Sequence, residues 1–147
     1  MEHAFVIPAF GDSPYLAGCV ASLHAQRGPA SAIVVATSTP SAAIEQVARD
    51  AGVALRVNPT RGGIGADWNF ALRAAQAPFV TLAHQDDLFR DDYVERMRAA
   101  VAGIPDVLMA FSDFDEVDPQ GPRPMHPNLR VKRFLVRRAF AARAAVD

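Results

Sequence analysis

The sequence predicts an α/β fold in which a mostly parallel sheet carries helices on both faces. Over residues 1–115, short apolar runs rich in β-branched side chains alternate with segments whose apolar side chains recur at helical spacing. That alternation is typical of consecutive βαβ units. The apolar runs are also nearly continuous, which is expected of strands whose two faces are both covered by helices. A chain of 147 residues has the length of one domain.

Five strands and four connecting helices are expected in alternating order. The strands are the apolar runs at residues 4–9, 32–37, 53–57, 79–83 and 107–112. The helices are indicated by apolar side chains at helical spacing, in sets that begin at Tyr15, Ile44, Trp68 and Tyr93. Ser13 and Ser41 are expected to cap the first two helices, because a hydroxyl oxygen there can accept a hydrogen bond from an unpaired helix N–H group.

Charge is distributed unevenly along the chain, although the formal net charge is only −1. Residues 1–118 contain 15 acidic and 8 basic residues, whereas residues 119–147 contain 1 acidic and 7 basic residues. An acidic body matches nucleic-acid phosphates poorly, so we expect no nucleic-acid partner. The single cysteine, Cys19, cannot form an internal disulfide and is expected to be a small buried apolar residue.

The candidates for binding and catalysis are the residues that directly follow each expected strand. Right-handed crossovers place the carboxyl ends of parallel strands at one edge of the sheet, and ligands of open α/β sheets bind at that edge. The segments in question are residues 10–12, 38–39, 58–65, 84–87 and 113–118. The last of these segments is acidic and is expected to be a solvated edge at the end of the fifth strand.

Asp86 and Asp87 follow the fourth expected strand directly, where two carboxylates face the ligand edge. Mg²⁺ or Mn²⁺ normally takes one or two carboxylates together with phosphate oxygens and water, so this pair could hold a metal–nucleotide complex. The pair is also consistent with a solvated turn before the next helix. His84 is either a third ligand or a hydrogen-bonding neighbour of the two carboxylates.

A glycine-rich segment, NPTRGGIGADWNF at residues 58–70, lies between the third strand and the third helix. Arg61 offers a fork of N–H donors that fits phosphate, and the glycines allow a ligand to approach the backbone. A dinucleotide fingerprint is not supported, because Trp68 stands where the third glycine is required. A plain glycine-rich turn is the alternative to a phosphate-binding loop. The sequence also lacks the motifs of serine hydrolases, P-loop proteins and zinc proteases.

The order of these motifs resembles glycosyltransferase family 2, whose members have a nucleotide-sugar-binding domain of the GT-A type. Four segments are similar in the same order, and the resemblance extends over about residues 3–122. The segments are AFVIPAFGDSPYLAGCVASLHAQ, NPTRGGIGADWNFALRAAQAPFVTLAHQDD, DLFRDDYVERM and FSDFDEVDPQG. The resemblance implies that the chain binds a nucleotide sugar, with a UDP- or dTDP-sugar as the expected donor.

The resemblance also assigns site residues by position. The implied nucleotide-sugar-binding residues are Pro8, Ala9, Phe10, Asn58, Arg61, Gly65, Asn69 and Gln85. Asp86, assisted by Asp87, is the implied ligand of a Mg²⁺ or Mn²⁺ ion that neutralises charge on the departing nucleoside diphosphate. Two positions depart from the family pattern. His84 replaces a frequent aspartate, and residues 36–38 lack the aspartate that usually holds the base.

We therefore expect the donor-binding part of a glycosyltransferase that transfers a sugar to an acceptor with inversion and metal assistance. The alternative is a non-catalytic module of the same fold that binds a nucleotide sugar or a partner. In the family the catalytic base comes from a later acidic segment that has no counterpart here, so the catalytic residues and the acceptor stay unassigned. The chain is expected to be truncated before that segment and to transfer sugar poorly by itself.

The turn-rich residues 118–124 predict a boundary between a nucleotide-sugar-binding domain at 1–122 and a basic helical tail at 123–147. Basic side chains alternate with apolar ones in the tail, as in an amphipathic helix. The tail is expected to dock on the acidic face of the body, to form a homodimer or partner contact, or to bind an anionic membrane surface. No signal peptide or spanning segment is evident, so we expect a cytoplasmic chain or one at the inner face of the membrane.

Overall fold

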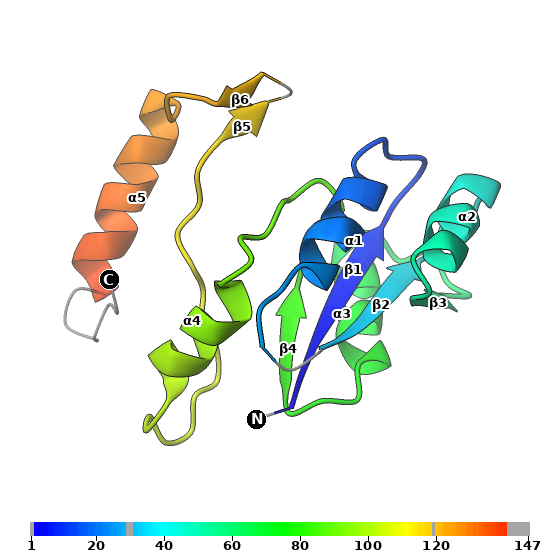
Figure 1. Ribbon diagram of the computed structural model, residues 1–147, viewed down its shortest axis with the longest axis horizontal. Helices are drawn as coiled ribbons and strands as arrows, with labels where there is room; N and C mark the ends of the chain where they lie inside the picture. Colours follow the sequence, from blue (N-terminus) through cyan, green and yellow to red (C-terminus); the bar gives the residue numbers. More distant parts are fainter. Residues whose placement is uncertain (1, 29–30, 119, 141–147) are drawn as a thin grey trace. The chain divides into compact units, whose positions relative to one another are not determined.

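The computed structural model describes residues 2–28, 31–118 and 120–140 (Figure 1). The chain divides into two compact units, of which the first comprises Met1–Glu95 and the second comprises Arg96–Asp147. The expected boundary between residues 122 and 123 falls within the second unit and stays a prediction. No helix in the described part of the chain is long and apolar enough to cross a membrane.

A four-stranded sheet forms the centre of the first unit. Its strands are β1 (His3–Ala9), β2 (Ala32–Thr37), β3 (Ala54–Val57) and β4 (Phe79–Leu82). They lie in the order β3-β2-β1-β4, and every neighbouring pair is parallel (Figure 1). The structure thus confirms four of the five expected strands. Because all four run in the same direction, their carboxyl ends meet at one edge of the sheet, which we call the ligand edge.

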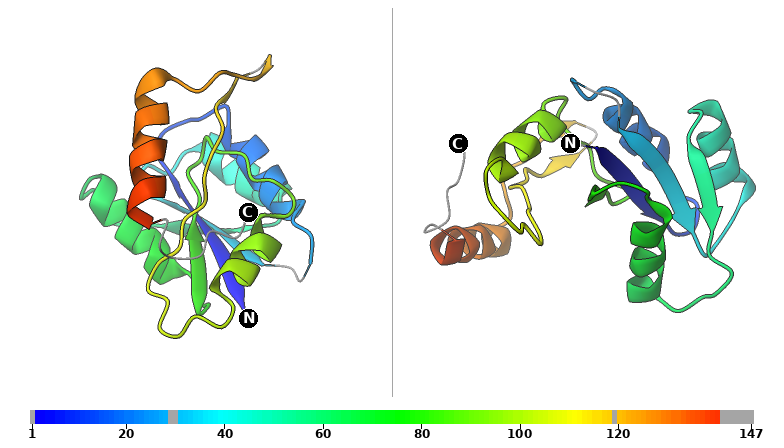
Figure 2. Two further views of the ribbon diagram at one scale, coloured as in Figure 1. Left: turned by 90° about the vertical axis from the view of Figure 1, so that its left-hand side faces the viewer. Right: turned by 90° about the horizontal axis from the view of Figure 1, so that it is seen from below.

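Helices cover both faces of this sheet. Their bounds are α1 (Leu16–His24), α2 (Ala42–Asp50) and α3 (Ile64–Ala74). α1 and α2 lie on one face and α3 lies on the other (Figure 2, right). Side chains of β1 alternate between the two faces, so that Phe5 and Ile7 pack with α1 and α2, whereas Val6 packs with Ala71 of α3. This arrangement explains the nearly continuous apolar strands and confirms the predicted fold class.

Local sequence determines where the first two helices begin. The Ser41 hydroxyl accepts a hydrogen bond from the Ile44 N–H group at 3.3 Å, which confirms the expected cap of α2. The expected cap of α1 is wrong, because this helix begins only at Leu16. The Ser13 hydroxyl instead accepts a hydrogen bond from the Tyr15 N–H group, within the turn that precedes the helix.

Two glycines shape the entry into α3. Gly63 precedes the helix with a φ of 80°, a conformation that side chains with a Cβ atom rarely adopt. At Gly62 a Cβ atom would lie 2.5 Å from the Cβ atom of Ala66 in the first turn of α3. Steric constraints therefore explain the glycines at these two positions, independent of any ligand.

The second unit consists of short elements joined by ion pairs. α4 (Tyr93–Val101) begins in the first unit and continues into the second, β5 (Val117–Asp118) pairs with β6 (Gly121–Pro122), and α5 is Pro127–Phe140. Asp113 accepts hydrogen bonds from Arg133 and Arg137 of α5. The basic tail is therefore helical over Pro127–Phe140, and this helix contacts the acidic segment that precedes it. Homodimer and membrane contacts of the tail stay predictions.

The expected fifth strand at residues 107–112 is wrong, because these residues form neither strand nor helix. The side chain of Leu108 is 99% exposed and that of Met109 is 77% exposed. A strand requires a neighbouring strand for its backbone hydrogen bonds, and neither sheet of the described part includes this run. The acidic residues 113–118 consequently do not end a strand of the central sheet.

Candidate functional site

Loops that leave the ends of all four strands meet at the ligand edge. The residues that directly follow β1, β2, β3 and β4 are Phe10, Ser38, Asn58 and Ala83. Backbone hydrogen bonds extend the parallel ladder beyond the strands: the Asn58 N–H group donates to the Thr37 carbonyl at 2.7 Å, and the Ala83 N–H group donates to the Val6 carbonyl at 2.9 Å. The starting points of the loops are thereby fixed by the sheet, as in other ligand sites of open α/β folds.

Three side chains with metal-binding groups lie together after β4, namely His84, Asp86 and Asp87. Their ligand atoms are all within 4.8 Å of one another, and all three residues are exposed. A turn brings them together, because the Asp87 N–H group donates to the His84 carbonyl at 3.1 Å. The Nδ1 atom of His84 lies 3.7 Å from the Oδ2 atom of Asp87. The two predicted metal ligands therefore lie side by side, with His84 as a third candidate.

This donor set fits a divalent cation of the predicted kind. Mg²⁺-type ions take six ligands at about 2.1 Å in octahedral geometry, so neighbouring ligand atoms are about 3 Å apart and opposite ones about 4 Å apart. The limit of 4.8 Å in this cluster is close to the second value, and rotation of the exposed side chains can close the difference. Two carboxylates and an imidazole would leave coordination positions for phosphate oxygens and water.

Burial, and to a smaller extent the negative charge of the cluster, raises the pKa of two groups here. The pKa of the Asp87 carboxyl is raised by partial burial and by the adjacent Asp86, against the opposing effect of His84. Burial, with further contributions from Asp87 and Asp86, raises the pKa of the Cys19 thiol to about 12. Cys19 is fully buried, as predicted, and its neutral thiol donates to the His84 carbonyl at 3.3 Å. A bound cation would offset the repulsion between the two carboxylates.

The Gln85 side chain binds the backbone of the loop after β1. Its Oε1 atom accepts a hydrogen bond from the Phe10 N–H group, and its Nε2 atom donates to the Phe10 carbonyl, both at 3.1 Å. The Gly11 N–H group also donates to the Thr39 hydroxyl at 2.8 Å. Gln85 was predicted to contact the nucleotide sugar. In this structure its side chain joins the segment of Asp86 and Asp87 to the loop of Phe10, and its contact with a nucleotide sugar stays a prediction.

Among the three residues predicted at the end of β1, only Phe10 extends away from the sheet. Ala9 is buried and Pro8 is half-buried as part of the strand. The Phe10 side chain, in contrast, is 69% exposed. An exposed aromatic ring at a ligand edge offers a flat apolar surface on which a nucleobase can stack. A side-chain contact with a ligand is thus available to Phe10 but not to Ala9.

Asp67, a carboxylate in the first turn of α3, joins three segments at the ligand edge. Its Oδ2 atom accepts a hydrogen bond from the Ser38 hydroxyl at 2.9 Å, and its Oδ1 atom accepts one from the Asn58 side-chain amide at 3.1 Å. Asn58, which was predicted to bind the nucleotide sugar, is buried and also accepts hydrogen bonds from Thr60. Asp67 therefore brings to the end of β2 a carboxylate that the β2 segment itself lacks.

Sequence reasoning did not identify Asp67, because its contact with Ser38 joins residues 29 positions apart. The only available signal was the acidic residue itself in the first turn of a helix. That position is common in proteins because a negative charge there is favourable toward the helix dipole. The pattern therefore carries no information about the partner.

The other predicted residues lie before α3 or within it. Arg61 is exposed, and its Nε atom donates to the Ser38 carbonyl at 3.2 Å. No other hydrogen bond of the Arg61 guanidinium is found within the described part of the chain, so its terminal nitrogens can face an anion. Gly65 and Asn69 are exposed in α3, and a Cβ atom at Gly65 would meet no atom within 4 Å. Packing within the first unit therefore does not explain the glycine at position 65.

Trp68 brings α3 into contact with the cluster of His84, Asp86 and Asp87. Its ring centroid lies 5.2 Å from that of His84, and the two ring planes are inclined by 31°. The sequence indicates only that a bulky residue stands where a dinucleotide site would need glycine. The stacking of Trp68 on His84 depends on the packing of α3 beside the end of β4. The periodicity of the sequence does not predict this contact.

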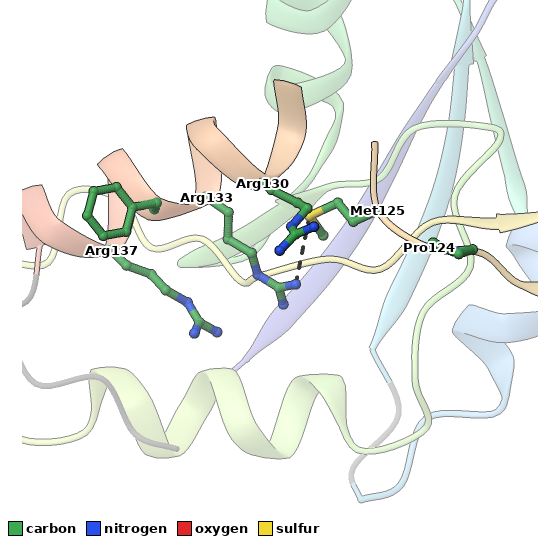
Figure 3. Close-up of a pocket in the computed structure, with 6 residues that line it drawn as sticks. Pro124, Met125, Arg130, Arg133 and Arg137 are labelled. Carbon is green, nitrogen blue, oxygen red and sulfur yellow. Dashed lines mark hydrogen bonds between the residues drawn. The ribbon is translucent and has the colours of Figure 1, made fainter. Parts of the chain in front are cut away.

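A separate hollow of about 410 Å³ lies in the second unit (Figure 3). It is lined by Pro124, Met125, Arg130, Arg133, Phe134 and Arg137. Arg133 also contacts the sulfur of Met125 at 3.9 Å, and both Arg133 and Arg137 are paired with Asp113. None of the predicted binding residues lines this hollow, so the candidate site remains the ligand edge of the first unit.

The structure is similar to solved structures of glycosyltransferases. It matches S. aureus TarS 1-349 in complex with UDP-GlcNAc with a TM-score of 0.58 and 24% sequence identity, over 69% of this chain and 31% of that chain. It matches the mannosyltransferase PcManGT from Pyrobaculum calidifontis, in complex with GDP-Man and Mn²⁺, with a TM-score of 0.61 and 19% identity, over 70% and 33% of the two chains. The chain thus spans about a third of the length of these proteins.

These likenesses confirm the α/β fold with a mostly parallel sheet, of the GT-A type that the motif order implied. A comparison with curated protein sequences found no match. A family model described as "Glycosyl transferase family 2" matches residues 4–144, which is nearly the whole chain. That match includes every residue predicted for the site. The chain therefore belongs to glycosyl transferase family 2.

Proposed function

We propose that this chain is the donor-binding part of a metal-assisted glycosyltransferase and that it binds a nucleotide sugar at the ligand edge of its first unit. The observation that carries this proposal is that hydrogen bonds join a candidate cation site to a candidate base-binding residue. A cluster suited to a divalent cation contains Asp86 and Asp87, and an exposed ring suited to a base belongs to Phe10. Gln85, the neighbour of Asp86, holds the backbone of Phe10. A nucleoside diphosphate needs both elements at once.

Each part of the site has its own task in this proposal. Asp86 and Asp87 hold the cation, which when bound supplies a Lewis acid for the charge on the departing nucleoside diphosphate. Phe10 stacks on the base, and Gln85 holds the loop of Phe10 in place. The guanidinium of Arg61 approaches the phosphates, since a planar fork of N–H donors pairs well with phosphate oxygens.

Inversion requires that an acceptor hydroxyl attacks the anomeric carbon directly while the nucleoside diphosphate leaves. A general base has to take the hydroxyl proton. Asp113 suits this task poorly: burial acts to raise its pKa, but hydrogen bonds from Arg133, the Phe114 N–H group and Arg137 together lower the pKa below its ordinary value. We therefore propose that this chain alone transfers sugar slowly, because no base for the acceptor hydroxyl is assigned among the described residues and loss of a positioned base costs on the order of 10²- to 10⁴-fold in rate.

The donor stays a proposal, with a UDP- or dTDP-sugar preferred. TarS was solved with UDP-GlcNAc and PcManGT with GDP-Man, so a guanosine donor belongs in the test. Isothermal titration calorimetry of the folded chain with UDP-GlcNAc, dTDP-glucose and GDP-mannose, each with Mn²⁺ or with EDTA, tests the proposal. We expect one of these donors to bind only when Mn²⁺ is present. Binding of none of them, or equal binding in EDTA, would contradict it.

A further inference from the structure

One face of the His84 ring is packed while the ring remains accessible. Trp68 packs against one face of the imidazole at a centroid distance of 5.2 Å, and the His84 side chain is 49% exposed. The His84 carbonyl is fixed by two donors, the Cys19 thiol at 3.3 Å and the Asp87 N–H group at 3.1 Å. The ring therefore has a fixed backbone and a packed face, with solvent on its other side.

The nitrogens of this ring are available as ligands. The distance of 3.7 Å from Nδ1 to Asp87 Oδ2 is too long for a hydrogen bond. Within the described part of the chain, neither ring nitrogen forms a hydrogen bond. A His84 nitrogen and one carboxylate oxygen each from Asp86 and Asp87 nevertheless lie within 4.8 Å of one another. An imidazole beside two carboxylates, with no hydrogen bond from either nitrogen in the described part of the chain, has the arrangement of a metal ligand.

The chemistry of a third ligand determines which ion a site prefers. Sites made only of carboxylates and water suit Mg²⁺, which takes hard oxygen ligands and keeps much of its hydration. An imidazole nitrogen is a softer ligand, and the stability of its complexes rises from Mn²⁺ through Co²⁺ to Ni²⁺. Replacement of an oxygen ligand by His84 would therefore favour transition-metal ions over Mg²⁺.

We propose that His84 is the third protein ligand of the cation at the ligand edge and that it makes the site selective for Mn²⁺ and similar transition-metal ions over Mg²⁺. This inference rests on the proposed function, since it concerns the same cation. Trp68 is a positioning residue in this proposal: its ring restricts the rotation of the imidazole and keeps a nitrogen directed at the carboxylates.

The test uses the folded chain and the metal ions alone. Trp68 is the single tryptophan of the sequence, so quenching of its fluorescence by Mn²⁺ or Co²⁺ reports ion binding next to His84. Calorimetric titration gives the affinities for Mn²⁺, Co²⁺ and Mg²⁺. We expect Mn²⁺ to bind about 10-fold or more tightly than Mg²⁺, in line with the 10- to 100-fold effects that groups around a metal have on its affinity.

Three variants and one matched control isolate the contribution of His84. In His84→Asp, the preference for Mn²⁺ over Mg²⁺ should fall to within a few-fold, because all protein ligands are then carboxylates. His84→Gln should weaken Mn²⁺ and Co²⁺ binding with little change for Mg²⁺. Asp86→Asn should abolish the binding of all three ions. His24→Gln replaces an exposed histidine of α1 whose Nε2 atom contacts the Ala51 carbonyl, and it should leave every affinity unchanged.

A further variant tests the positioning residue. Trp68→Phe keeps an aromatic ring but reduces the contact, so we expect a partial loss of Mn²⁺ affinity, read by calorimetry, with the Mg²⁺ affinity preserved. A merely structural role of Trp68 would change both affinities alike. Such a result would overturn the positioning role.

The failure of this inference and the failure of the proposed function have different signatures. If a nucleotide sugar binds only with metal but His84→Asp and His84→Gln keep the wild-type ratio of Mn²⁺ to Mg²⁺ affinity, the inference is wrong and the proposed function stands. If the ion selectivity depends on His84 but no nucleotide sugar binds, the proposed function fails and the ligand assignment stands. Absence of any ion binding by the folded chain overturns the inference.

Discussion

The two units of this chain are stabilised in different ways. In the first unit, Phe5, Ile7 and Val35 are completely buried between the sheet and its helices. In the second unit, Arg96–Asp147, no described residue is buried, and Leu108 is 99% exposed. Its segments are joined instead by ion pairs such as those of Asp113 with Arg133 and Arg137.

This difference indicates which unit can hold a ligand in a fixed geometry. Binding groups need rigid support, which dense packing of a core provides and exposed ion pairs do not, because each exposed pair contributes only about 0.2–1 kcal/mol. All the predicted binding residues lie in the packed unit, at the ends of its strands or in α3 and the segment just before it. The predictions below test this contrast, from the largest expected effect to the smallest.

Removal of a core ring should have the largest effect. Phe5→Ala should lower the free energy of unfolding of the first unit by about 3–5 kcal/mol, because it removes a fully buried ring that packs against Phe89 and Tyr93. Leu108→Ala, the matched control in the second unit, should change stability by less than about 0.5 kcal/mol. Urea unfolding monitored by circular dichroism measures both. Equal losses would remove the contrast between the units.

Loss of the Asp67 carboxylate should cost less, because only hydrogen bonds are removed. Asp67→Ala leaves the Ser38 hydroxyl and the buried Asn58 amide without their acceptor, so we expect a loss of about 1–3 kcal/mol in unfolding free energy. Asp50→Ala, at the exposed end of α2, is the control and should be nearly neutral. Thermal unfolding of the two variants compares them. An Asp67→Ala variant as stable as the control would show that the network is dispensable.

The ion pairs of Asp113 should contribute a small, pH-dependent stability. Its pKa is lowered, so this contribution is complete above the ordinary carboxyl pKa of 3.8 and is lost as the pH falls through the lower folded value. Asp113→Asn should lose about 1 kcal/mol or less at pH 7, because the pairs are partly exposed. The helical signal of both proteins, titrated from pH 7 to pH 2, measures this. A difference between them that persisted unchanged at pH 2 would refute the assignment.

The smallest effect on stability is expected at Gln85. Gln85→Ala removes two hydrogen bonds to Phe10 at an exposed position, so the unfolding free energy should change by less than about 0.5 kcal/mol. Donor affinity should nevertheless fall, since the Phe10 loop would lose its link to the metal-binding segment. Calorimetric titration with a nucleotide sugar and Mn²⁺ measures the donor affinity separately from the unfolding free energy. Unchanged affinity would mean that Phe10 is positioned without Gln85.

Most of the first unit could be predicted from the sequence because its signals are local. The apolar runs of β1–β4 and the helical spacing of α1–α3 lie within single segments, and parallel topology then places the strand ends together. Residues 107–112 show the same apolar pattern but form no strand, because a strand also needs a partner that composition does not reveal.

In the candidate site, too, the sequence predicts features within one segment but not contacts between segments. Asp86 and Asp87 were found because they are adjacent in the sequence and follow a strand. The contacts of Asp67 with Ser38 and of Trp68 with His84 cross between elements, so only the packed structure contains them. Gln85 was recognised by position, but its partner was not, since Phe10 lies 75 residues earlier in the chain.

The central claim is that the ligand edge of the packed unit binds a nucleotide sugar through a cation held by Asp86. Calorimetric titration of a nucleotide sugar in the presence of Mn²⁺, with the wild-type chain, Asp86→Asn and the control Asp50→Asn, tests it most directly. We expect the wild type and Asp50→Asn to bind alike, and Asp86→Asn to lose metal-dependent binding while its thermal unfolding stays unchanged. Metal-dependent binding by Asp86→Asn with wild-type affinity would contradict the claim.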